Sequence, residues 1–114
     1  MDTMMWYTAC LFFEGVCDKP QEEGNLWEER CVLVQGDDAA EVEQRARQIG
    51  EAGEHDYTTA DGNFLRWHFR KVERVYQLID DELQDGTEVF SRFLDDSQAA
   101  SLLQPSVDRI GDQL

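Results

Sequence analysis

The sequence predicts an α+β domain: a mostly antiparallel four-stranded sheet with one helix packed on one face, followed by a helical C-terminal tail. Two segments rich in aromatic and branched residues come first, at 5–13 and 26–35, and such residues favour strands. One stretch with apolar residues at helical spacing follows, at 39–53. Two more apolar segments, 64–79 and 87–94, complete the expected order β-β-α-β-β.

The first two segments predict a pair of neighbouring strands. Residues 5–13, MWYTACLFF, are apolar on both alternating faces, as expected of an interior strand. Residues 26–35, LWEERCVLVQ, alternate in their first half and are apolar in their second half. Residues 15–25 between them combine glycines, a proline and acidic residues, which is typical of a solvated loop. The simplest topology pairs the two strands antiparallel through this loop.

The helix is predicted from its start signal and from one narrow apolar stripe. Asp37 and Asp38 can each cap the first exposed backbone N–H groups. The stripe consists of small or branched residues, which lets the helix lie close to a sheet: Ala39, Val42, Ala46, Ile49 and Gly53. The helix is expected to end near Gly50 or Gly53, and residues 55–63 are expected to form a loop.

Segment 64–79 fits two interpretations. As a helix, its apolar residues follow one stripe, with Leu65, Phe69, Val72, Tyr76, Ile79 and Leu83 spaced by three and four. As a strand, it places Trp67 and Phe69 on one face and a basic stripe on the other, and the apolar phase slips near Val72, which requires a β-bulge. Periodicity favours the helix, whereas the aromatic and branched composition favours the strand.

The remaining chain divides into a last strand and a tail. Residues 80–86 are a polar connection, and residues 87–94, TEVFSRFL, have a strand pattern that would form a hairpin with a strand at 64–79. We expect residues 1–94 to form a single domain and residues 95–114 an acidic helical tail, docked or flexible. Pro105 divides the tail into two helical pieces, and Asp96 or Ser97 caps the first.

A set of short signatures, spread over about residues 5–94, resembles the bacterial family called domain of unknown function number 4288. They are Trp6-Tyr7 with Leu11 and Glu14, Glu28-Glu29 before Val32-Leu33-Val34, Tyr57, Trp67, Phe69, Val72, Val75, Tyr76, and the block 85–93, DGTEVFSRF. The resemblance implies a strand–strand–helix–strand–strand order, and therefore a strand at 64–79. The family often has Tyr where this chain has Phe90. The resemblance implies no activity.

The charge is strongly negative and unevenly distributed. Twenty-five acidic and ten basic residues give −15. Residues 64–94 hold six acidic and five basic residues, a net −1, so the other 83 residues carry −14. Acidic surfaces repel nucleic-acid phosphates and anionic membranes, so we expect neither as a partner. The expected partners are a second copy of the chain, because the aromatic residues exceed what one helix can cover, and a basic protein.

The sequence contains no recognisable catalytic or metal-binding motif. The cysteines, Cys10, Cys17 and Cys31, are odd in number and include no CxxC pair, so no disulfide framework is expected. Cys10 and Cys31 lie in apolar runs and are expected to be buried. His55 and His68 do not have metal-ligand spacing, and we expect no metal and no cofactor. Without a secretory signal, the expected location is the cytoplasm.

The polar residues of the two C-terminal strands are the candidate ligand or partner site. They are Arg66, His68, Arg70, Arg74, Glu88, Ser91 and Arg92. The basic stripe among them either binds an anionic ligand or receives carboxylates of the same protein. The favoured function is a non-enzymatic interaction or regulatory module, and an enzyme is the less favoured class. The alternatives are an immunity-type inhibitor of a basic protein and a small enzyme or anionic-ligand-binding protein.

Overall fold

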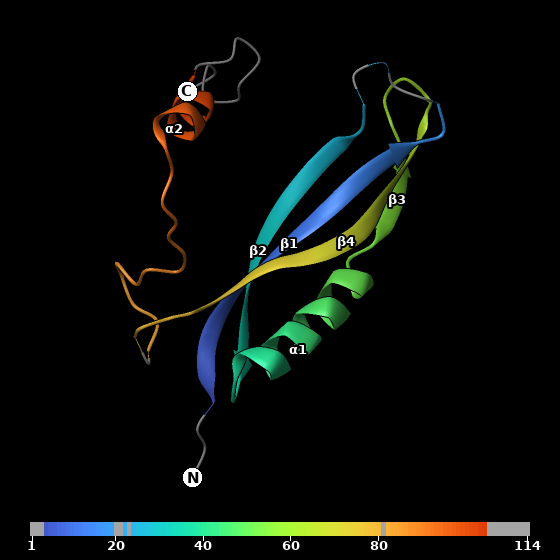
Figure 1. The fold of residues 1–114 in the computed structure, drawn as a ribbon. Coiled ribbons are helices and arrows are strands. Elements are labelled where there is room, and N and C mark those ends of the chain that lie inside the picture. The colour runs from blue at the N-terminus through green and yellow to red at the C-terminus, as the bar shows by residue number, and fades with distance from the viewer. Residues whose placement is uncertain (1–3, 20–21, 23, 81, 105–114) are drawn as a thin grey trace.

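The computed structural model describes residues 4–19, 22, 24–80 and 82–104. In these ranges the elements, in chain order, are β1 (Met5–Cys17), β2 (Leu26–Gly36), α1 (Ala39–Ala52), β3 (His55–Thr58), β4 (Phe64–Gln77) and α2 (Asp96–Leu103). The strands form one antiparallel sheet in the order β2-β1-β4-β3 (Figure 1). Neither helix in these ranges has both the length and the apolar character that crossing a bilayer requires.

The predicted α+β class and the antiparallel pairing of the first two strands are confirmed. β1 and β2 pair from Met5 opposite Gly36 to Gly15 opposite Leu26. Segment 64–79 is a strand, β4, which lies on the other side of β1. The register between β1 and β4 shifts twice, on either side of the position where Val72 faces Leu11. The irregularity expected near Val72 is therefore present, and it keeps apolar residues on one face over the length of β4.

The identity of the fourth strand was predicted wrongly. His55–Thr58, expected to be a loop, is the edge strand β3, which forms a hairpin with Phe64–Trp67 of β4. Its four residues are all exposed, so they lack the apolar alternation that marks a half-buried strand. Residues 87–94, expected to be a strand, have no strand partner in the described structure. Their backbone and side chains instead bind the face of the sheet, as described below.

The core lies between α1 and one face of the sheet. Tyr7, Ala9, Leu11 and Phe13 of β1 point into it, together with Val34, Val42, Ala46, Leu65 and Trp67. Asp38 caps α1 as predicted, since its carboxylate accepts a hydrogen bond from the Glu41 N–H at 2.8 Å. Ile49, predicted to be in the buried stripe, is 41% exposed.

Small residues bring α1 close to the sheet. A Cβ added to Gly50 would lie 2.4 Å from Cδ1 of Phe69, so the helix backbone rests directly against this aromatic ring. Gly50 is therefore part of the packing surface, rather than the end of the helix, which continues to Ala52. This close approach seats α1 on one face of the sheet, and no helix within the described ranges covers the opposite face (Figure 1).

The first helical piece of the tail is confirmed, but its cap is Asp95 and not Asp96 or Ser97. The Gln98 N–H donates to Asp95 Oδ1 at 2.8 Å, and the Asp95 N–H donates to Gln98 Oε1 at 3.0 Å, which is a capping box. α2 has no buried residue and contacts none of the other described helices and strands (Figure 1). The second piece, expected after Pro105, lies outside the described residues.

Candidate functional site

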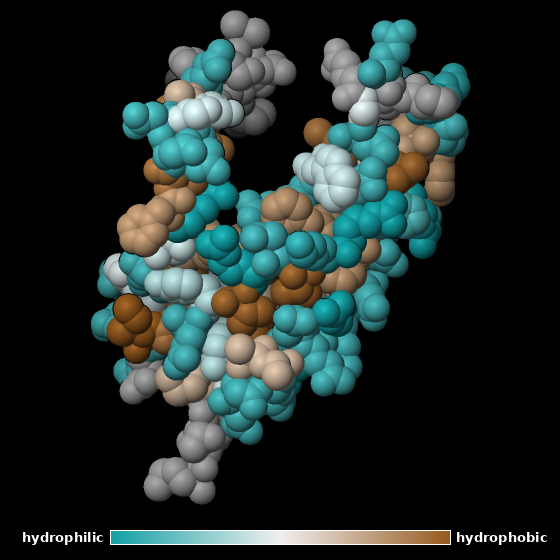
Figure 2. Space-filling model, in the orientation of Figure 1, coloured by the Kyte–Doolittle hydropathy of each residue, from teal (hydrophilic) through white to brown (hydrophobic). Residues whose placement is uncertain are grey.

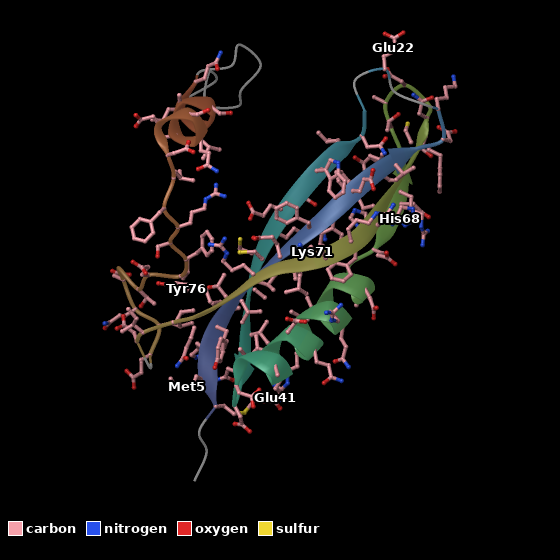
Figure 3. All side chains as sticks on the ribbon, in the orientation of Figure 1. Met5, Glu22, Glu41, His68, Lys71 and Tyr76 are labelled. Carbon is pink, nitrogen blue, oxygen red and sulfur yellow. The ribbon has the colours of Figure 1, made fainter. Side chains whose placement is uncertain are left out.

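The sheet face opposite α1, called the open face, carries the polar residues of β4. Alternating residues of three strands form it: Thr8, Cys10, Phe12 and Glu14 of β1, Trp27, Glu29, Cys31 and Leu33 of β2, and His68, Lys71, Arg74 and Tyr76 of β4. Figure 3 shows His68, Lys71 and Tyr76 spaced along β4, with Tyr76 beside the C-terminal segment. The predicted site residues of β4 therefore share a surface with two cysteines and with exposed apolar side chains of β2.

The predicted basic stripe pairs with carboxylates of the same chain. The pairs are Arg66 with Asp56 at 3.0 Å, His68 with Glu54 at 4.0 Å, Arg70 with Glu14 at 2.9 Å and Arg74 with Glu73 at 3.6 Å. β3 supplies Asp56, directly opposite Arg66 in the register. Such exposed pairs contribute little to stability, but the three arginine pairs each occupy a cation that an anionic ligand would need. The geometry thus favours the second of the two interpretations of the stripe.

Glu14 is an ionised partner and a poor general acid. Its Oε2 accepts a hydrogen bond from Asn25 Nδ2 at 2.7 Å, and its Oε1 accepts one from Arg70 Nε at 2.9 Å. The Asn25 hydrogen bond first, and then the Arg70 guanidinium, hold the pKa of the Glu14 carboxyl below its usual value. A general acid at neutral pH needs the opposite shift.

Residues 87–91 lie across the open face and are held there by Tyr76. The Tyr76 hydroxyl donates to Glu88 Oε2 and accepts from Ser91 Oγ, the latter at 3.3 Å. The Phe90 ring meets the Tyr76 ring edge-on, with centroids 6.0 Å apart, and the Arg74 guanidinium lies 5.6 Å from the Phe90 centroid. We call these five residues, with Thr8, the Tyr76 cluster.

Thr8 supplies the backbone anchor of the cluster. Its hydroxyl donates to the Val89 carbonyl, across 81 positions of the chain, and Thr8 is 2% exposed. Of the predicted site residues, Arg74, Glu88 and Ser91 thus come together. Arg92 makes no hydrogen bond or ion pair with any described residue. Sequence reasoning missed Thr8 and Tyr76, although Thr8 is the one polar residue in the apolar run 5–13.

Cys10 and Cys31 lie side by side on the open face. They are directly opposite in the register, and their sulfur atoms are 3.3 Å apart. Cys10 is fully buried, as predicted. Cys31, also expected to be buried, is exposed, because β2 is an edge strand and none of the described helices covers this face. Burial, together with Cys31, raises the pKa of the Cys10 thiol to about 12.

A carboxylate accompanies the two thiols. An oxygen of Glu29 and the two sulfurs lie within 4.8 Å of one another, a possible set of three donors for a soft divalent metal. The sequence predicted no metal site, because these residues become neighbours only through the pairing of β1 with β2.

The C-terminal arm, residues 92–104, exposes apolar side chains. The Phe93 side chain is fully exposed, Leu103 is 78% exposed, and Leu94 and Leu102 are 40% and 52% exposed. Figure 2 shows the arm separated by open space from the upper part of the sheet. Trp27 and Leu33 of β2, at 51% and 40%, are exposed on the open face. Arm and open face are therefore two apolar surfaces that do not cover each other.

Two surface hollows contain no catalytic set among the described residues. A hollow of about 410 Å³ at one end of the sheet is lined by Cys17, Asn25 and Asp61, among others. A second of about 560 Å³, beside β2 and α1, is lined by Trp6, Gln35 and Arg45, among others. The Cys17 thiol donates a hydrogen bond to Asp18 Oδ1, with sulfur and oxygen 3.8 Å apart.

A family model described as Domain of unknown function (DUF4288) matches residues 6–91. No curated protein and no solved structure matches the chain. The matched range includes the whole Tyr76 cluster and ends at Ser91, immediately before the arm.

Proposed function

The chain belongs to the DUF4288 family, and we propose that it is a non-enzymatic interaction module whose C-terminal arm docks on the open face of a second copy. The observation that carries this proposal is the exposure of Phe93 and Leu103 on an arm whose helix, α2, contacts no other described helix or strand. Contiguous exposed apolar side chains on a small protein mark interaction surfaces.

The energetics favour a symmetric dimer. Full burial of a Leu or Phe side chain stabilises by roughly 1.5–3 kcal/mol. Since Leu94 and Leu102 are already about half buried, the four apolar side chains of one arm supply roughly 4–8 kcal/mol. In a two-fold dimer each arm docks once, which doubles this gain. Association costs about 4–15 kcal/mol in lost freedom of motion. The gain from one arm lies in the lower part of the range of that cost, whereas the gain from two arms, roughly 8–16 kcal/mol, reaches its upper end.

Charge complementarity directs the arm to the open face. The arm carries Asp95 and Asp96 at the start of α2. Most of the surface of a chain with net charge −15 would repel these residues. Lys71 of β4 lies on the open face and makes no ion pair with a described residue, so it can meet the acidic start of α2. Acidic and apolar groups of the arm thus meet basic and apolar groups of the partner.

The Tyr76 cluster prepares the arm for docking. Its hydrogen bonds hold residues 88–91 on the sheet, so the arm leaves the sheet from a fixed point. A segment whose starting position is already set loses less conformational entropy when it binds.

The test is sedimentation velocity on the full chain at tens of micromolar. We expect a dimer for the wild type and a monomer for the double variant Phe93→Ser, Leu103→Ser, because both side chains are exposed and lie outside the core of the single chain. Leu26→Ser is the matched control. Leu26 is 67% exposed but lies on the face of β2 opposite the open face, so this variant should form the same dimer as the wild type.

A monomeric wild type, or a double variant that still forms the dimer, would refute docking on a second copy. Should a monomeric chain capture a basic protein at low salt and lose it at high salt, the immunity-type alternative would replace the proposal.

A further inference from the structure

The paired thiols on β1 and β2 have the geometry of a disulfide site. Residues opposite each other in an antiparallel pair have Cα atoms about 4.5–5.5 Å apart, within the range of about 4.4–6.8 Å that disulfides span. Cys10 and Cys31 are such a pair, and their sulfurs are 3.3 Å apart. A disulfide bond is about 2.05 Å long, so the sulfurs need to move closer by little more than 1 Å.

The two thiols differ in access. Cys31 is exposed in the single chain, so a reagent in solution can reach it whenever no arm of a second copy covers the open face. Cys10 has no exposed surface, and the neighbouring carboxylates of Glu29 and Glu73 disfavour its thiolate in addition to burial. Cys31 is therefore the thiol that reacts first, and Cys10 is placed to react only with a sulfur already attached to Cys31.

We propose that Cys10 and Cys31 are a site of reversible oxidation by low-molecular-weight disulfides, such as oxidised glutathione. Cys31 first loses its proton to water, and its thiolate attacks one sulfur of the reagent. This attack forms a mixed disulfide and breaks the S–S bond of the reagent. The other half of the reagent leaves as a thiolate and takes up a proton. Cys10 then loses its proton and attacks the Cys31 sulfur, which expels the second reagent thiol. The protein loses two electrons and two protons, and the reagent is reduced to two thiols.

The disulfide product would link the edge strand β2 covalently to β1. β2 pairs only with β1 in the sheet, and the new bond would join these strands near the middle of their register. On the open face Cys31 lies between Glu29 and Leu33 of β2, so a mixed disulfide trapped there would have a carboxylate on one side and an exposed apolar side chain on the other.

The test uses the full chain with Cys17→Ser, which removes the third thiol. The protein is treated with oxidised glutathione, quenched in acid, alkylated after unfolding, and weighed intact by mass spectrometry. We expect both remaining thiols to be lost together, no glutathione to be retained, and a peptide map that links Cys10 to Cys31. Adding Cys10→Ser should leave a stable glutathione adduct on Cys31. Adding Cys31→Ser, an exposed change that leaves the core intact, should leave Cys10 unmodified.

Three results would overturn the proposal. The first is glutathione retained on Cys31 while Cys10 is intact. The second is a disulfide that joins two chains, seen on a non-reducing gel. The third is a pair that stays reduced, including the case in which added zinc binds tightly and protects it, which would assign a metal centre with Glu29 instead.

Discussion

Replacement of Tyr76 by Phe removes one hydroxyl from the Tyr76 cluster and keeps the ring. The variant loses the hydrogen bond that the hydroxyl donates to Glu88 and the hydrogen bond that it accepts from Ser91. The edge-on contact of the ring with Phe90 remains. A hydrogen bond to a charged group contributes about 1.5–3 kcal/mol when buried. Because Glu88 is exposed and can be solvated instead, we expect a smaller loss, about 0.5–1.5 kcal/mol, for the attachment of residues 87–91.

Limited proteolysis with trypsin at Arg92 measures this attachment directly. Arg92 is exposed, but a protease must also bind the residues before it, and the cluster holds residues 88–91 on the sheet. When opening and closing are fast, the cleavage rate follows the population of the open form. A loss of about 0.5–1.5 kcal/mol therefore predicts cleavage at Arg92 that is about 2- to 12-fold faster in Tyr76→Phe.

Tyr57→Phe is the matched control. Tyr57 is 47% exposed on β3, and its hydroxyl makes no hydrogen bond with the described residues, so cleavage at Arg92 should keep the wild-type rate. Equal cleavage rates for Tyr76→Phe and wild type would refute the role of the Tyr76 hydroxyl. Equally fast cleavage in both variants would show a general loosening of the sheet and would also refute it.

Three further outcomes are expected from urea unfolding. Gly50→Ala should lower the free energy of unfolding by about 1–2 kcal/mol. The added methyl group overpacks against Phe69, which costs about 1–3 kcal/mol, and the higher helix propensity of Ala offsets up to about 1 kcal/mol of this cost. A variant at least as stable as the wild type would contradict the close contact. The Cys10–Cys31 disulfide should raise the free energy of unfolding by about 3 kcal/mol, through closure of a short loop in the unfolded chain, and no gain would indicate a strained bond. Because the pKa of Glu14 is lower in the folded than in the unfolded chain, its carboxylate stabilises the fold at pH values above its pKa in the unfolded chain. This stabilisation is lost as the pH falls through the pKa of Glu14 in the folded chain. Acidification should therefore destabilise the wild type more than Glu14→Gln, and equal pH dependence would contradict this.

Local pattern in the chain was enough to predict the fold class and most elements. The apolar runs of β1 and β2, the stripe and Asp38 cap of α1, and the phase slip near Val72 of β4 are all features of residues near one another in sequence. Strand and helix periodicity follow from backbone geometry, so such features can be read without knowing the tertiary contacts. The choice between helix and strand for β4 needed the family resemblance as well.

Only the tertiary structure decided which of these residues act together. Thr8 and Val89 are 81 positions apart, and Cys10 and Cys31 are 21 apart; both contacts follow from how strands align and how the chain returns over the open face. Edge strand β3 has no apolar alternation, because all four of its residues are exposed. Residues 87–91 have a strand pattern, yet their hydrogen bonds to Thr8 and Tyr76 place them across the sheet, because side chains distant in sequence compete with strand pairing for the same polar groups.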